Sequence, residues 1–376
     1  MGIPLLARLV DMLHPLVPLL ALVGPLIPGG DARVAGAEAR QPAHPHTLIA
    51  LAGTGLAALL DDGTTGVRMV GEAHELAPNG VLVTRPFALE PFIEVLPSWN
   101  VDVGDGGGFR VEGRFGTLTG ELGPWVTFGG WGAEPGSAVT VTSWGPEEAR
   151  HRVAVDVLEA ASPLSRLQLR VVAAGDASLR LEHLTFVTTA PPERAVGLDR
   201  SAPAPAADLL LDVPARCQRD GGAAIAHRIC SPTSVSMLLE FHGHSHATDA
   251  VAALLHDRAH DLYGNWNRAV QGAFQLGCRG RLERMATWGD VESSLRAGHP
   301  FAISIRAEEG ELANAPYPRT SGHLLVVCGL LADGGVAVRD PAASPPSEVP
   351  RTYTRADLQR VWLERNGVAY VLTGPR

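Results

Sequence analysis

The stretch Ile229-Cys230-Ser231-Pro232-Thr233-Ser234 places a cysteine at the predicted start of a helix. Pro232 suits a first helical turn, where its missing N–H leaves no hydrogen bond unmade. Apolar residues recur at helical spacing from Val235 to His242, and Gly243 ends the pattern. Because the macrodipole and the free N–H groups of a helix N-terminus favour an anion, we predict a lowered pKa for the Cys230 thiol.

Three side chains far from this helix complete the set that thiol chemistry requires. Gln218 precedes the cysteine, and Ser321-Gly322-His323 and Arg339-Asp340-Pro341 follow it. A thiol nucleophile works with an amide donor for the oxyanion, an imidazole base and a carboxylate that orients the imidazole. The sequence therefore predicts a cysteine-dependent hydrolase that cleaves a peptide or amide bond through a thioester acyl-enzyme.

A hairpin is expected to bring the imidazole and the carboxylate together. Residues 323–328 are typical of a buried strand, 333–335 of a turn and 336–340 of the returning strand. In a simple register, Asp340 falls about five residues short of facing His323. We therefore expect strong twist or a β-bulge to close that distance.

Taken in order, these four elements resemble a known family, the papain-like cysteine peptidases of the bacteriocin-leader-processing type (peptidase family 39 of the cysteine class). Their stand-alone bacterial relatives are more similar still, and the resemblance covers residues 211–376. It implies a papain-like α+β fold, a peptide or protein substrate and no cofactor. It also implies four roles, namely nucleophile, general base, orienting acid and oxyanion donor, for Cys230, His323, Asp340 and Gln218.

The sequence departs from this family in two places. Ser231 stands where the commonest form of the motif has glycine, and the segment between Gln218 and Cys230 is longer than in the transporter-linked peptidases. No Walker-type glycine loop and no set of membrane spans follows, so a leader-peptide exporter is not predicted.

Each candidate side chain also has a structural interpretation. Cys230 alone is compatible with an ordinary core cysteine, His323 with a strand histidine, Asp340 with the start of a turn and Gln218 with a polar loop. The alternative function is a catalytically inactive peptidase-like protein that binds a cell-wall or peptide ligand. Acyl transfer to an amine would use the same site as hydrolysis.

The other cysteines and the histidines do not form a metal motif. Cys217, Cys278 and Cys328 include no Cys-x-x-Cys pair, and Cys328 is expected in the core. Two of the cysteines could pair if the protein is exported. The alternation His242-x-His244-x-His246 falls just past the predicted helix end, so we interpret it as a solvated turn and predict no metal.

Composition indicates two domains with an appendage at the N-terminus. The 376 residues are 45% hydrophobic and 19% charged, which provides material for two cores. The net charge of −9 is dispersed along the chain, so neither nucleic acid nor an anionic membrane is expected as a partner.

Residues 1–39 form a candidate signal or targeting segment. Residues 16–27 are apolar, and Ala35-Gly36-Ala37 resembles a small-residue cleavage site. Four prolines between residues 15 and 28 argue against a stable membrane span. We therefore expect a secreted or cell-envelope protein, with a cytoplasmic one as the alternative.

Residues 40–190 are predicted to form a β-sandwich. Short alternating strands occur at residues 92–96, 108–115, 125–128 and 166–172. The region is similar to the β-rich domain that precedes the peptidase-like domain in some of the bacterial relatives. Its tryptophans could form a platform for a carbohydrate or cell-wall ligand. We favour a structural role, either in the core or as aromatics that pin hairpins, for Trp99, Trp125, Trp131 and Trp144.

A proline- and alanine-rich linker at residues 191–210 leads into the second domain. There we predict a helix capped by Thr248 or Asp249, helices at residues 263–276 and 290–297, and a last helix opened by Thr354-x-x-Asp357. Strands are expected at residues 301–305 and 368–372.

Overall fold

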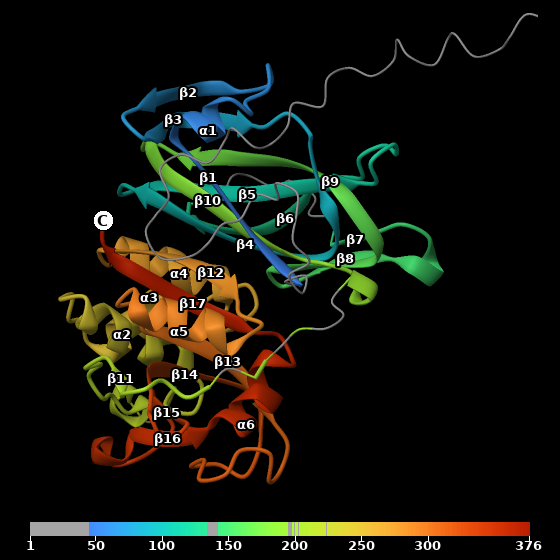
Figure 1. The fold of residues 1–376 in the computed structure, drawn as a ribbon. Helices are drawn as coiled ribbons and strands as arrows, with labels where there is room; N and C mark the ends of the chain where they lie inside the picture. Colours follow the sequence, from blue (N-terminus) through green and yellow to red (C-terminus); the bar gives the residue numbers. More distant parts are fainter. Residues whose placement is uncertain (1–44, 134–141, 195–197, 199, 202, 223) are drawn as a thin grey trace, which may run out of the picture.

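The computed structural model describes residues 45–133, 142–194, 198, 200–201, 203–222 and 224–376. The candidate targeting segment at residues 1–39 lies outside these described residues. The rest forms two domains, an N-terminal domain built almost wholly of strands and a C-terminal domain of helices and strands (Figure 1). Among the described residues, no helix is both long and apolar enough to cross a bilayer.

The first domain is an antiparallel sheet of ten strands in one hydrogen-bonded network. Neighbouring strands follow the order β2-β3-β10-β4-β9-β5-β6. In addition, β3 pairs with β9, so β3, β10, β4 and β9 form a closed ring of paired strands. The predicted β-rich character is confirmed, and the β-sandwich stays a prediction. The strands are β1 His46–Ala52, β2 Thr65–Val70, β3 Ala73–Val83, β4 Phe87–Val103, β5 Gly107–Gly116, β6 Val126–Gly132, β7 Ser143–Trp144, β8 His151–Ala154, β9 Val157–Gly175 and β10 Leu179–Thr189, with the short helix α1 at Gly53–Ala57.

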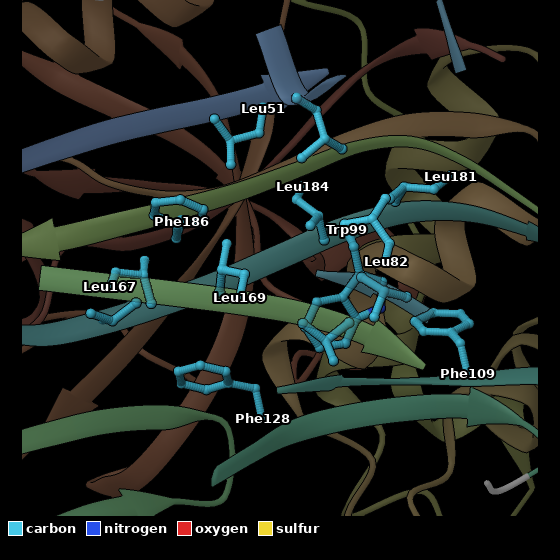
Figure 2. Packing of buried hydrophobic residues seen from close by; sticks show 14 of the residues in the cluster. Leu51, Leu82, Trp99, Phe109, Phe128, Leu167, Leu169, Leu181, Leu184 and Phe186 are labelled. Atoms are coloured by element: carbon cyan, nitrogen blue, oxygen red, sulfur yellow. The ribbon is translucent and has the colours of Figure 1, made fainter. Parts of the chain in front are cut away.

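Alternating apolar residues of these strands meet in one core (Figure 2). Trp99 is only 1% exposed and meets Phe109 edge-on, with ring centroids 6.1 Å apart. Trp131 is buried as well, and the Trp125 ring contacts the guanidinium groups of Arg114 and Arg170. The expectation that the tryptophans pack in the core is thus confirmed for Trp99 and Trp131.

The second domain combines helices with an antiparallel sheet of seven strands, in which the order is β12-β17-β13-β14-β15-β16 and β11 pairs with β14. Three of its helices, α2 to α4, come between β11 and β12 in the chain. Its strands are β11 Leu209–Leu210, β12 Cys278–Arg284, β13 Phe301–Ala307, β14 Thr320–Leu330, β15 Gly335–Arg339, β16 Pro350–Thr354 and β17 Val368–Pro375. Its helices are α2 Cys230–Phe241, α3 Thr248–Leu255, α4 Trp266–Gln275, α5 Trp288–Arg296 and α6 Arg355–Leu358.

Helix starts are where the sequence-based boundaries need correction. Neither Thr248 nor Asp249 caps α3, because its N-cap is Ala247 and makes no side-chain hydrogen bond. The helix predicted from residue 263 starts at Trp266, after the Asn265 side chain accepts from the Arg268 N–H. The predicted cap of the last helix is confirmed, since Thr354 accepts from the Asp357 N–H at 3.0 Å.

The first domain covers an open edge of the second domain's sheet. In the described part of the chain, β12 pairs with no strand other than β17. Asn100 of β4 donates to the Gly280 carbonyl at 3.0 Å and accepts from the Gly280 N–H at 3.1 Å, and Ser98 accepts from the Leu282 N–H at 2.9 Å. Because unpaired main-chain groups are costly when buried, these side chains replace a neighbouring strand. Figure 1 shows β4 on the side of the first domain that faces β12 and α4.

Helix α4 is also held by the first domain. The Asp156 carboxylate, 5% exposed, accepts from the Trp266 N–H at 2.8 Å and so caps the helix. Gln271 accepts from the Val101 N–H at 3.1 Å and donates to the Val101 carbonyl at 2.7 Å. Burial raises the pKa of Asp156 to about 6 against the opposing hydrogen bonds from the backbone. The position of α4 therefore depends on both domains.

Replacing Asn100 with alanine is expected to lower the free energy of unfolding by about 1–3 kcal/mol, because it leaves the buried N–H of Gly280 without its acceptor in the interface. Urea denaturation of the full chain measures this. The control is Asp102→Ala on the same strand, whose exposed ion pair with Arg376 is worth at most about 1 kcal/mol. Equal losses in the two variants would show that Asn100 does not stabilise the sheet edge.

Candidate active site

Cys230 is the first residue of α2, as predicted, and it is the half-buried one among four free cysteines. The other three are buried, which confirms the core position expected for Cys328. Helix α2 ends at Phe241, and Gly243 follows with φ +88°, a left-handed conformation that glycine adopts without strain. The helix pattern read from the sequence is therefore confirmed at both ends.

Helix α2 lies against the strand that carries the imidazole. One turn after the cysteine, the buried Ser234 hydroxyl donates to the Leu324 carbonyl at 3.2 Å. Leu324 directly follows His323 in β14, so this bond fixes the helix start relative to the imidazole. Ser234 thus helps to position the helix against the strand. The helical spacing of apolar residues in the sequence did not predict this role.

His323 and Asp340 meet at the end of the β14–β15 hairpin. His323 Nε2 lies 2.8 Å from Asp340 Oδ1, and both side chains are buried. Val326 faces Arg339, so in this register Asp340 lies opposite position 325, two residues along β14 from His323. The predicted distance of about five residues was therefore too large. The register shift between Val327 and Gly329 is the expected bulge. The hairpin is also tighter than predicted, because β14 continues to Leu330.

Two tyrosines that the sequence analysis missed hold the carboxylate of Asp340. The hydroxyls of Tyr317 and Tyr353 donate to Oδ2 at 3.0 and 2.8 Å, and the Ala342 N–H donates to Oδ1 at 3.0 Å. Burial and the charge of Asp340 raise the pKa of both phenols, so each remains a protonated donor. The Tyr317 ring also meets the His323 ring edge-on at 4.9 Å. The imidazole is therefore fixed by its partner and by the partner's own contacts.

The charges of the site favour a thiolate and an imidazolium. Burial alone would raise the pKa of Cys230, but the hydrogen bond and charge of His323, with backbone hydrogen bonds from Leu324 and Ser231, outweigh it and lower the pKa. Burial alone would lower the pKa of His323, but the charge of Asp340 and its hydrogen bond outweigh that effect and raise the pKa. Burial would likewise raise the pKa of Asp340, and the His323 charge lowers it instead.

Gln218 reaches the same region from the chain before α2. It begins a short 3₁₀ turn, Gln218–Gly221, and its N–H donates to the carbonyl of Pro341 at 2.9 Å. Its side-chain Oε1 is buried without a hydrogen-bond partner. This contact places Gln218 beside the Asp340 segment, while its oxyanion role stays a prediction.

Ser231, which departs from the family's motif, is fully buried, and its hydroxyl lies 3.3 Å from the Tyr370 hydroxyl. The chain has four tyrosines, and all of them are at this site. Two hold Asp340, Tyr370 contacts Ser231, and Tyr263 lines the cavity beside the cysteine. This concentration of tyrosines in the second domain was the one signal in the sequence that pointed to them.

A cavity of about 400 Å³ opens beside the cysteine. The sheet contributes Ile305, Gly322 and Leu324 to its lining, and the segment leading into α4 contributes Tyr263 and Trp266. Because the Trp266 N–H is held by Asp156, the first domain supports one wall of this cavity. The thiol therefore faces a space that a substrate can enter.

The three alternating histidines do not gather around a common centre. His242 Nε2 lies 3.1 Å from the Leu372 carbonyl, and His246 Nε2 lies 3.3 Å from the Leu276 carbonyl. Among the described residues, no group of three or more His, Cys, Asp or Glu side chains is arranged to hold a metal ion.

Two protein-family models match this chain, one in each domain. Residues 210–370 match the Peptidase_C39 like family, and residues 78–187 match the Peptidase C39 N-terminal domain. No curated protein matches the chain. The crystal structure of a double glycine motif protease from an AMS/PCAT transporter, in complex with the leader peptide, is 14% identical with a TM-score of 0.31, over 44% of this chain and 94% of that one. A structure of infectious bursal disease virus, Gx strain, is 9% identical with a TM-score of 0.22, over 44% and 40%.

The matches identify a Peptidase_C39-like domain at residues 210–370 and a Peptidase C39 N-terminal domain at residues 78–187. They support a cysteine peptidase-like function. The family resemblance of the sequence is thereby confirmed.

Proposed function

We propose that the protein is a cysteine-dependent hydrolase that cleaves a peptide or amide bond through a thioester acyl-enzyme. One observation carries this proposal. The half-buried Cys230 thiol, beside a cavity, is hydrogen-bonded to the His323 imidazole, whose Nε2 lies 2.8 Å from the buried Asp340. A buried carboxylate that orients an imidazole, which in turn contacts a thiol, is the arrangement that nucleophilic catalysis uses.

In this mechanism, the Cys230 thiolate attacks the carbonyl carbon of the scissile bond. The Cys230 N–H at the start of α2 and the Gln218 amide stabilise the oxyanion. The His323 imidazolium gives its proton to the leaving amine, which leaves a thioester on Cys230. Neutral His323 then takes a proton from water, the water attacks the thioester, and the thiolate leaves. Asp340 holds the imidazole in line throughout, and the arrangement of α2 against β14 supports a papain-like fold for this domain.

Acylation with p-nitrophenyl acetate tests this function. We expect a burst of about one equivalent of p-nitrophenolate, an acetyl group on Cys230 by peptide mass mapping, and loss of that group by hydrolysis. Cys230→Ser should abolish the burst, and the matched control Cys278→Ala, which removes a buried cysteine outside the cavity, should retain it.

Two other outcomes would contradict the proposal. Acetylation of Cys230 no faster than that of free cysteine would mean that His323 does not activate the thiol. A stable acetyl group that water does not remove would favour the alternative function, a peptidase-like protein that binds its ligand without turnover.

A further inference from the structure

We propose that the cavity beside Cys230 selects substrates that carry a carboxylate next to the scissile bond, as in an acidic peptide. This inference rests on the proposed function and names the substrate class of the same site. Its starting point is the charge of the cavity. The chain has 40 acidic and 31 basic residues, yet the charged side chains that line this cavity are both arginines, Arg228 and Arg306. No carboxylate among the described residues lines it.

The two arginines come from opposite parts of the site. Arg228 lies two residues before Cys230, on the approach to α2. Arg306 belongs to β13 and directly follows Ile305, which pairs with His323. Both arginines line the same cavity as Cys230. A substrate bound in this cavity would therefore lie close to both.

The side chain of Arg228 is held in place by its neighbours. Its guanidinium lies over the Tyr263 ring, 5.3 Å from the centroid, pairs with Asp261 Oδ2 at 2.9 Å and donates to the Asp261 carbonyl. The Asp261 side chain is 68% exposed, so solvent screens part of this ion pair. The Arg228 guanidinium is thus fixed in position, and its charge is already paired with Asp261, which leaves Arg306 as the main group to attract a substrate carboxylate.

Arg306 carries the uncompensated charge. Its Nε donates to the Ser321 carbonyl at 3.2 Å, and no carboxylate within the described residues pairs with it. Ser321 and Arg306 both line the cavity. Apolar side chains, including Leu262, Trp266 and Leu324, complete the lining. The cavity therefore fits an aliphatic segment that ends in, or lies next to, a carboxylate.

Alkylation of Cys230 by iodoacetate and by iodoacetamide tests the charge preference at the thiol itself. Iodoacetate carries a carboxylate where iodoacetamide carries a neutral amide. The rate constant for iodoacetate divided by that for iodoacetamide therefore measures how strongly the site attracts an anion to the thiol. His323 contributes to the ratio in every variant, and the arginines are therefore tested by substitution. We expect Arg306→Gln to lower the ratio about 3- to 10-fold, and Arg306→Gln with Arg228→Gln to lower it further.

The matched control is Arg68→Gln. It removes the same charge from β2, at the end of the first domain farthest from the second domain, and should leave the ratio unchanged (Figure 1). High salt should reduce the ratio in the wild type, because it screens exposed charges. Ratios that are equal in the wild type and in both arginine variants would overturn the inference.

Cleavage of a proteome-derived peptide mixture extends the test to substrates. The wild type should cut bonds enriched in Asp and Glu at neighbouring positions, and Arg306→Gln should lose this enrichment. Cleavage without any acidic preference would overturn the substrate class and leave the hydrolase function standing. Failure of iodoacetamide to label Cys230 faster than free cysteine would instead refute the hydrolase function itself.

Discussion

Asp340→Asn is expected to cost about 3–5 kcal/mol of unfolding free energy at pH 5, because it removes the charge of a buried ion pair while keeping its shape. The Asp340 side chain is completely buried and accepts from two tyrosine hydroxyls, the imidazole and a backbone N–H. Chemical denaturation monitored by circular dichroism measures the loss. The matched control is Asp261→Asn, whose pairs with His256 and Arg228 are exposed to solvent, so its loss should be much smaller.

The pH dependence of this loss follows from the directions of the two shifts. The pKa of Asp340 lies below its ordinary 3.8, so its contribution is complete above pH 3.8 and is lost as the pH falls through the lowered value. The pKa of His323 lies above its ordinary 6.5, so its contribution is complete below pH 6.5 and is lost as the pH rises through the raised value. The difference between wild type and variant should therefore be greatest between pH 3.8 and 6.5. A loss that does not change with pH would mean that the pair is not ionic.

His323→Ala is expected to raise the pH midpoint for alkylation of Cys230, because burial raises the pKa of this thiol and the hydrogen bond and charge of His323 are the largest effects that lower it. At pH 6 the rate with iodoacetamide should fall about 10- to 100-fold, since less thiolate is present and its greater basicity offsets only part of the loss. Stopped-flow alkylation with intact-mass detection measures both quantities.

The control for this variant is His256→Ala. His256 also pairs with an aspartate and stacks on Tyr263 with ring centroids 4.4 Å apart, but it does not line the cavity. Its removal should leave the midpoint where it is in the wild type. An unchanged midpoint in His323→Ala would mean that the helix start alone lowers the pKa of the thiol, and the imidazole would lose its assigned role.

Much of the site was predictable because its parts have local signals. Pro232 and Gly243 bound α2, and the turn at residues 331–334, close to the predicted 333–335, makes the β14–β15 hairpin. If the domain is assumed to have a papain-like fold, these short-range features are enough to predict that Cys230, His323 and Asp340 lie close together. The register itself was not predictable, since the bulge at Cys328 and the extension of β14 depend on packing against neighbouring strands.

The residues that support the site had no local signal. Tyr317 lies in the loop between β13 and β14, and nothing in its sequence neighbours indicates that it contacts Asp340. Asn100 and Ser98 look like polar residues of an ordinary strand, yet their partners are about 180 residues away in the chain. Helix starts were misplaced for a related reason, because α4 is capped partly by Asp156 of the other domain. Contacts of this kind follow from tertiary packing and not from periodicity.

The contact between β4 and β12 means that the peptidase-like half is not a removable module. If a gene were cut at the linker, the excised half would present the bare amides of Gly280 and Leu282 along an uncovered strand, together with arginines that have lost their acidic partners. An exposed edge strand can form backbone hydrogen bonds with a strand of another molecule, so we expect the isolated fragment to self-associate.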